Sequence, residues 1–270
     1  MKYLKIIFKS LLDFLKDGGI ILAGSISYFS MTAILPLCLF LVTIFGYIIG
    51  QHEGFYKFLS GRLIHFFPEI TSEITTQLGK LIAFKGIGII SLVLYVILSF
   101  PVFSSIENAL NIIFKVKQKR HFFWSIMLSL VIIALIMFIL FVSFTATSFI
   151  PILKTLKPVF PELRIGLITG FLIRYIVPFF MVLFTATIMY IFLPKTKVRI
   201  SHAFTGALFT AIFLEIAKHI FTWYVGNVAQ FGTIYGPLSA FIMFLLWVYY
   251  SSCVFLIGAE IVYNQGISKK

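Results

Sequence analysis

Three ionisable residues stand close together within one long apolar stretch of the sequence. The segment 208–223, LFTAIFLEIAKHIFTW, contains Glu215, Lys218 and His219. Because these residues are three and four positions apart, they share one face of a helix. Such a set can line the path of a substrate, with Glu215 as a proton carrier. It can equally be a static ion pair that holds helices together, and the sequence leaves both interpretations open.

A fourth charged residue, Arg174, lies in another apolar segment, 166–193. If that segment enters the membrane from the outer side, Arg174 reaches a depth similar to that of Lys218. An unpaired charge at the centre of a bilayer costs at least about 2.5–3.5 kcal/mol. We therefore expect Glu215 to lie against Lys218, Arg174 or both, with these side chains facing the interior of a helical bundle.

The composition indicates a protein that is surrounded by lipid. Hydrophobic residues make up 60% of the 270 residues and charged residues 11%, against roughly half and about one quarter in soluble domains. A soluble fold of this composition would expose large apolar patches. The net charge of +13 is compatible with nucleic-acid binding, but membrane proteins also collect Lys and Arg on their cytoplasmic loops.

The apolar segments predict an all-α fold, a polytopic transmembrane helical bundle of about six spans within residues 20–265. A span needs about 20 apolar helical residues. Six segments meet this length, near 24–50, 86–106, 122–150, 166–193, 202–226 and 236–263. The connection 51–85 is expected to form amphipathic helices at the outer interface. The uncharged link 226–236 is either an outer loop or re-entrant.

Residues 1–19 predict a separate element, a basic amphipathic helix that lies in the headgroup plane. Apolar residues recur there every three or four positions, and Lys and Asp occupy the other faces; this pattern is typical of interfacial helices. Basic residues of this helix, of the loops 115–120 and 195–199 and of the C-terminus outnumber those of the remaining loops. This bias predicts that both termini are cytoplasmic.

Two further acids, Glu107 and Glu260, are expected near the cytoplasmic face, at the ends of the second and sixth spans. With basic neighbours such as Lys115, they form either interfacial ion pairs or a charged cytoplasmic gate. Three prolines interrupt predicted spans and free backbone carbonyls there, which marks hinges or harmless bends: Pro36, Pro101 and Pro178. Small residues predict sites of close helix packing, namely Gly206, Gly236, Gly258 and Ala259.

No pattern in the chain indicates catalysis, a metal site or a cofactor. The nine carboxylates are scattered and the five histidines lack zinc spacing. Glu215 and His219 could supply two metal ligands, but no third one is evident. No G-x-x-x-x-G-K-[ST] loop for ATP occurs. The basic loops are explained by membrane orientation, so we expect no nucleic-acid partner and no enzymatic activity.

Several motifs resemble the YihY/BrkB family of polytopic bacterial inner-membrane proteins, over roughly residues 20–265. They are GSISYFSMTAILPL, SSIENALNIIFKVKQKR, MYIFLPKTKVRISHAFTGALFTAIFLEIAKHIFTWYV and YGPLSAFIMFLLWVYYSSCVFLIGAEI. The resemblance implies about six spans in the inner membrane. Members of the family carry an old ribonuclease BN label and a virulence-factor label, and are commonly described as candidate transporters.

The main functional hypothesis is movement or flipping of an anionic or amphiphilic, envelope-related substrate. Cationic groups at membrane depth suit a phosphate or carboxylate head group, and the missing ATP loop means that this chain alone is not ATP-driven. The alternative is a scaffold that transports nothing, and a ribonuclease is the least favoured. The expected partners are the lipid bilayer and an anionic or lipid-like substrate, while the sequence does not determine the oligomeric state.

Overall fold

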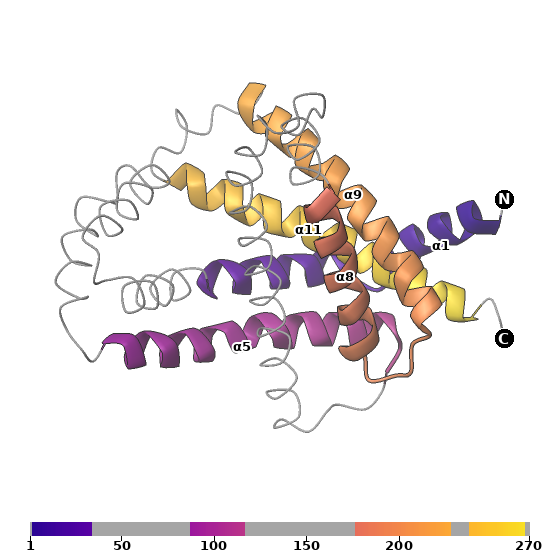
Figure 1. Cartoon of the computed structure of the whole chain (residues 1–270), viewed down its shortest axis with the longest axis horizontal. Helices are drawn as coiled ribbons and strands as arrows, with labels where there is room; N and C mark the ends of the chain where they lie inside the picture. The colour runs from indigo at the N-terminus through magenta and orange to yellow at the C-terminus, as the bar shows by residue number, and fades with distance from the viewer. Residues whose placement is uncertain (1, 34–86, 117–175, 228–237, 268–270) are drawn as a thin grey trace, which may run out of the picture. The chain divides into compact units, whose positions relative to one another are not determined.

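A computed structural model describes residues 2–33, 87–116, 176–227 and 238–267 of the chain (Figure 1). Within these ranges the regular structure is entirely helical and contains no strand. The helices are α1 (Lys2–Lys16), the helix Gly19–Ala33, α5 (Ile87–Ile113), α8 (Val177–Phe192), α9 (Ile200–Asn227) and α11 (Ser239–Ile267). The predicted all-α fold is confirmed. The predicted elements 51–85, 122–150 and 226–236 lie wholly or mostly outside the described residues.

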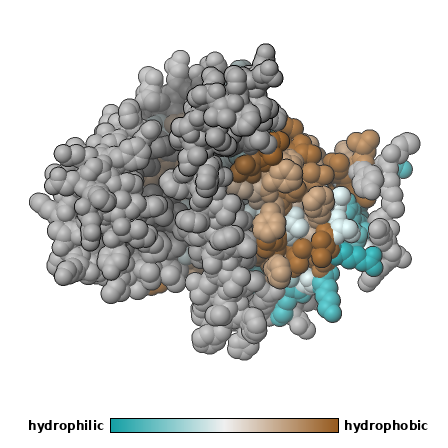
Figure 2. All heavy atoms as spheres, viewed as in Figure 1, coloured by the Kyte–Doolittle hydropathy of each residue, from teal (hydrophilic) through white to brown (hydrophobic). Residues whose placement is uncertain are grey.

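Two of these helices are long and apolar enough to cross a membrane, with candidate spans at Ile200–Tyr224 in α9 and Phe241–Gly266 in α11. Only 39% and 22% of their apolar stretches are buried inside the protein, whereas the core helix of a soluble protein is mostly buried. Many residues of these two helices are therefore only partly covered by the rest of the protein. Figure 2 shows apolar side chains over most of the visible described surface, with hydrophilic ones gathered at one edge.

Three other apolar helices are shorter within the described residues: Gly19–Ala33, Ile97–Ile113 and Val177–Phe192. Pro101 lies in the interior of α5, which continues to Ile113. Pro178 lies in the first turn of α8, where a missing N–H leaves no hydrogen bond unmade. Pro36 lies outside the described residues.

The chain divides into two compact units, and each is described by itself. The first consists of Met1–Ile20, Glu107–Lys218 and Cys253–Lys270, and the second of Ile21–Ile106 and His219–Ser252. In the second unit, short polar side chains connect helices. Ser25 Oγ lies 3.2 Å from Ser105 Oγ, and Ser27 donates to the carbonyl oxygen of Leu245 at 2.7 Å. Such small polar residues let membrane helices approach closely and share hydrogen bonds.

In the first unit, α9 and α11 come closest at two glycines. A Cβ atom on Gly206 would lie 2.6 Å from the carbonyl oxygen of Gly258 and 2.3 Å from Cγ2 of Val262. A Cβ atom on Gly258 would lie 2.1 Å from Oγ1 of Thr210 and 2.4 Å from the hydroxyl of Tyr190. There is no room for either atom. The predicted close helix packing at Gly206 and Gly258 is confirmed.

Tyr190 of α8 joins these two helices through its hydroxyl group. The side chain is fully buried, and its hydroxyl donates to the carbonyl oxygen of Phe255 at 2.6 Å. The same oxygen lies 2.8 Å from Oγ1 of Thr210, and the Tyr190 ring stacks on that of Phe255. Because lipid offers no hydrogen bonds, a polar group within the bundle must be satisfied from inside. This contact therefore joins α8, α9 and α11.

We expect Gly258→Ala to destabilise the protein, because its methyl group would separate α9 from α11 and displace the hydroxyls of Thr210 and Tyr190. Overpacking of this kind costs about 1–3 kcal/mol. Thermal unfolding in detergent should show a lower midpoint than for the unchanged protein. Gly24→Ala is the matched control, since a Cβ atom there meets nothing within 4 Å. An equal decrease of the unfolding midpoint in both variants would contradict the close approach of α9 and α11 at Gly258.

Candidate functional site

Helix α1 turns its apolar side away from the protein. Leu4, Phe8 and Leu15 are 72%, 65% and 54% exposed, whereas Ser10 and Phe14 are buried. A soluble amphipathic helix does the reverse and buries its apolar side against the core. The outward apolar side suits the predicted interfacial helix, whose apolar residues enter the boundary between headgroups and acyl chains.

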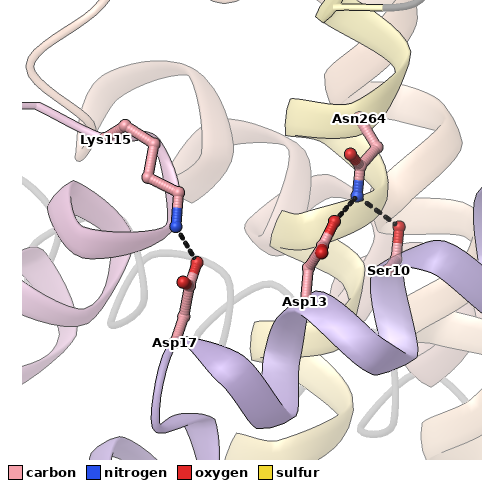
Figure 3. A network of polar contacts seen from close by, with 5 residues as sticks. All are labelled: Ser10, Asp13, Asp17, Lys115 and Asn264. Carbon is pink, nitrogen blue, oxygen red and sulfur yellow. Dashed lines mark hydrogen bonds and ion pairs between the residues drawn. The ribbon is translucent and has the colours of Figure 1, made fainter.

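The inward side of α1 makes polar contacts with α11 (Figure 3). The amide nitrogen of Asn264 donates to Oγ of Ser10 at 3.0 Å and to Oδ2 of Asp13 at 3.1 Å. Asn264 is 2% exposed. Direct hydrogen bonds in a buried setting are costly to break, because the groups left behind are not solvated. They fix the rotation of α1 about its own axis.

Just after α1, Asp17 reaches the segment that follows α5. The carboxylate of Asp17 accepts a hydrogen bond from Nζ of Lys115 and forms an ion pair with it (Figure 3). Asp17 is 15% exposed and Lys115 49%. Gly18 then takes a positive φ of 72°, which glycine adopts without strain, and the chain enters the helix Gly19–Ala33. The turn between these helices therefore carries one partner of the ion pair.

Lys115 ends α5 in a conformation that usually belongs to glycine. Its φ is 54°; Val116 N–H donates to the carbonyl of Asn111 at 2.9 Å, and Lys115 N–H to that of Ile112 at 3.0 Å. This is a Schellman cap, whose left-handed position normally costs a side chain about 1 kcal/mol or more. The Asn111 side chain also accepts from the backbone N–H of Lys195 at 3.0 Å. The cap thus anchors the segment before α9 and directs the Lys115 ammonium toward Asp17.

Glu260 of α11 is the most deeply buried acid in the described part of the chain. It has 0% exposure, and neither carboxyl oxygen accepts a hydrogen bond from a described residue. Asp17, Lys115 and Asp13 are charged groups that act on it, and the Asp17 carboxyl is within hydrogen-bonding reach. Two carboxyl groups therefore face each other beside one lysine. We call Asp13, Asp17, Lys115, Glu260 and Asn264 the polar junction.

The pKa of Lys115 is raised above its ordinary value of 10.5. Partial burial lowers this pKa, but the hydrogen bond from Lys115 to Asp17 and the attraction of Asp17 and neighbouring acidic groups together outweigh the burial. The charged form of the ammonium is thus favoured in the folded protein.

The raised pKa predicts how the ion pair depends on pH. Its stabilisation is fully present below the ordinary lysine pKa and is lost as pH rises through the raised value. We expect the unchanged protein to unfold at a higher temperature than Lys115→Met near pH 8, and this gap to shrink as the pH rises above the ordinary lysine pKa of 10.5. Thermal unfolding in detergent measures it. Lys197→Met, at an exposed loop lysine, is the control, and a gap that does not change with pH would contradict the assignment.

The charge set predicted within the fifth span is described in part. Lys218 donates to Oε1 of Glu215 at 2.5 Å as an i, i+3 ion pair, and the two side chains remain 40% and 26% exposed. This pair therefore lies along one helix. His219 is exposed, and Arg174 lies outside the described residues, so its expected partnership with Glu215 stays a prediction.

The predicted pair of cytoplasmic acids separates into two environments. Glu107 lies half-buried in α5, whereas Glu260 is fully buried in α11; Lys115, an expected basic neighbour, acts on Glu260. The sequence reasoning missed Ser10, Asp13, Asp17 and Asn264 as site residues. Their spacing was a usable signal, because positions 10, 13 and 17 share one face of a helix, as do 260 and 264.

Among the residues that the structure describes, no three His, Cys, Asp or Glu side chains are grouped to hold a metal ion. What the described part shows is a set of apolar helices joined by small residues and a few buried polar contacts. These features define a polytopic helical membrane protein.

Comparison with known proteins gives the family. The model of the Virulence factor BrkB family matches residues 11–266, and the chain belongs to this family. Its relatives include proteins named "UPF0761 membrane protein". The one from Chlorobium chlorochromatii is 30% identical over 94% of this chain and 58% of its own length. The one from Actinobacillus pleuropneumoniae is 28% identical over 90% of this chain and 88% of its own length.

A further relative, from Azotobacter vinelandii, is 25% identical over 95% of this chain and 62% of its own length. The chain thus spans about three-fifths of several of the relatives that it matches. No solved structure matches the chain. The family resemblance predicted from the motifs is confirmed, and the relatives' names support a membrane protein.

Proposed function

We propose that this chain is a multi-pass protein of the inner membrane, with both termini in the cytoplasm, that moves an anionic or amphiphilic substrate across the bilayer. The observation that carries the proposal is the ion pair of Glu215 and Lys218 within a candidate span. Glu215 is nine residues from the Tyr224 end of that span, about 14 Å along the helix axis, and about 22 Å from the Ile200 end. If this helix spans the bilayer, the pair is expected within the depth of the hydrocarbon core.

The exposure of the pair supports a path rather than a structural contact. About a quarter of the Glu215 side chain and two-fifths of the Lys218 side chain are uncovered. A charged pair that faced acyl chains directly would be costly. Water or an anionic head group in contact with Lys218 removes much of that cost, because a phosphate or carboxylate accepts charge-assisted hydrogen bonds from an ammonium. The substrate class follows from this chemistry.

The outward-facing apolar side of α1 and the exposed lysines next to it support a cytoplasmic N-terminus. The apolar side of α1 faces outward, and its lysines Lys5, Lys9 and Lys16 are exposed beside it. Basic residues of this kind bind the anionic surface of the cytoplasmic leaflet. The proposed function includes no enzymatic reaction and no nucleic-acid partner.

A lipid-translocation assay tests the proposal. The full chain is reconstituted into vesicles of phosphatidylcholine and phosphatidylglycerol that contain a trace of fluorescent phosphatidylglycerol, and dithionite bleaches the outer leaflet. We expect the inner-leaflet label to be bleached in a slower second phase, as the protein moves it to the outer leaflet. In Lys218→Met this second phase should be about tenfold slower, because the variant loses roughly the free energy of one ionic contact. Lys197→Met, which changes an exposed loop lysine outside the spans, should bleach like the unchanged protein.

Two results would contradict the proposal. Inner-leaflet label that is protected as well as in protein-free vesicles, for both phosphatidylglycerol and its lyso form, would favour a scaffold that transports nothing. Equal rates in the Lys218→Met and Lys197→Met variants would remove the Glu215–Lys218 pair from the path.

A further inference from the structure

If Glu260 is ionised, its buried negative charge receives no hydrogen bond from the described residues. Its carboxyl group has no exposed surface, and no described donor reaches either oxygen. A buried charge without hydrogen bonds is among the costliest features a fold can carry. Next to it stands Asp17, a second carboxyl group, which would repel it.

A proton removes this cost. When Glu260 carries a proton, its O–H can donate to the carboxylate of Asp17, which is within hydrogen-bonding reach. Asp17 then keeps its ion pair with Lys115. The proton neutralises Glu260, and the ammonium of Lys115 balances the charge of Asp17. This arrangement is similar to that of paired acids that share a single proton.

We propose that Glu260 and Asp17 form a proton-binding site in which one proton is held on Glu260, donated to Asp17, and exchanged with solvent through Asp17. Protonation forms the O–H bond on Glu260 with a proton from water on the side of the termini, and release returns it by the same route. Asp17 is 15% exposed and Glu260 is fully buried, so Asp17 is the member that reaches water.

The surroundings of the site set its response to pH. Asp13 and Asp17 approach Glu260 from α1 and the turn after it, and Lys115 from the end of α5. Tyr263 of α11 acts in turn on Lys115. On the α9 side of α11, His202 is buried near Gly266, about 9 Å along the helix from Glu260. Lys115 favours the ionised form of Glu260, and the aspartates favour the protonated form.

The protonation state of this site also affects the contact between α11 and the turn that follows α1. The interfacial helix is attached to α11 through Asn264, and the turn after it carries Asp17. Loss of the proton would place two adjacent negative charges between this turn and α11 and push them apart. In a protein that moves an anionic substrate, this site would supply the coupling ion; that part rests on the proposed function, whereas proton binding does not.

Infrared spectroscopy of the full chain in lipid vesicles tests proton binding directly. We expect a carbonyl stretch of a protonated carboxylic acid at pH 7, shifted in deuterium oxide and lost in Glu260→Gln. Glu107→Gln, which changes a half-buried acid of α5, should keep the band. Absence of the band in the unchanged protein, or its persistence in Glu260→Gln, would overturn the proposal.

Two more variants separate a proton site from a merely structural role. The pH at which the band disappears should fall by about one unit in Asp17→Asn, which lacks the negative acceptor, and rise by about one unit in Lys115→Met, which lacks the positive charge. Shifts in the same direction, or none, would contradict the pairing. A band with this behaviour in a protein that moves no fluorescent lipid would leave the proton site standing and reject the transport function.

Discussion

Lipid offers no hydrogen bonds, so a chain within it must satisfy its polar groups from inside or pay several kcal/mol for each one that it leaves unsatisfied. The described structure follows this constraint closely. Tyr190 donates to the carbonyl of Phe255, Asn264 donates to α1, and Lys115 pairs with Asp17. Both carboxyl oxygens of Glu260, like Oδ1 of Asn264, receive no hydrogen bond from a described donor, and Glu260 is where we place a proton.

The same constraint explains the unusual orientation of α1. Its apolar residues face outward and its polar edge faces α11, which is the arrangement expected of a helix whose apolar side enters lipid and whose polar side only the protein can satisfy. Gly18 and the left-handed Lys115 fix the two turns that bring Asp17 and Lys115 together. A strained lysine at a position suited to glycine is stable only when the surrounding contacts hold it. We regard the ion pair with Asp17 as that contact.

The sequence predicted what depends on local spacing or on solvent. The helical class, the amphipathic N-terminal helix and the Glu215–Lys218 pairing follow from composition and from separations of three or four residues. The polar junction does not, because Asn264 meets Ser10 and Asp13 across more than 250 positions of the chain. Spacing showed that these residues share helix faces, but the packing of α1 on α11 decides that the faces meet. Nothing in the local sequence around Lys115 indicates a left-handed cap either, since lysine has no preference for that conformation.

The orientation of α1 at the membrane surface is the claim on which this account depends most directly. Cys38 and Cys253 are replaced, and a spin label is attached to a single cysteine introduced at position 8 or 14. Collisions of the label with oxygen report contact with lipid, and collisions with a nickel chelate report contact with water. The account predicts a label at position 8 that collides with oxygen far more than with nickel, and a label at position 14 that is shielded from both. A label at position 8 that is freely accessible to nickel would show that water, and not lipid, covers the apolar side of α1.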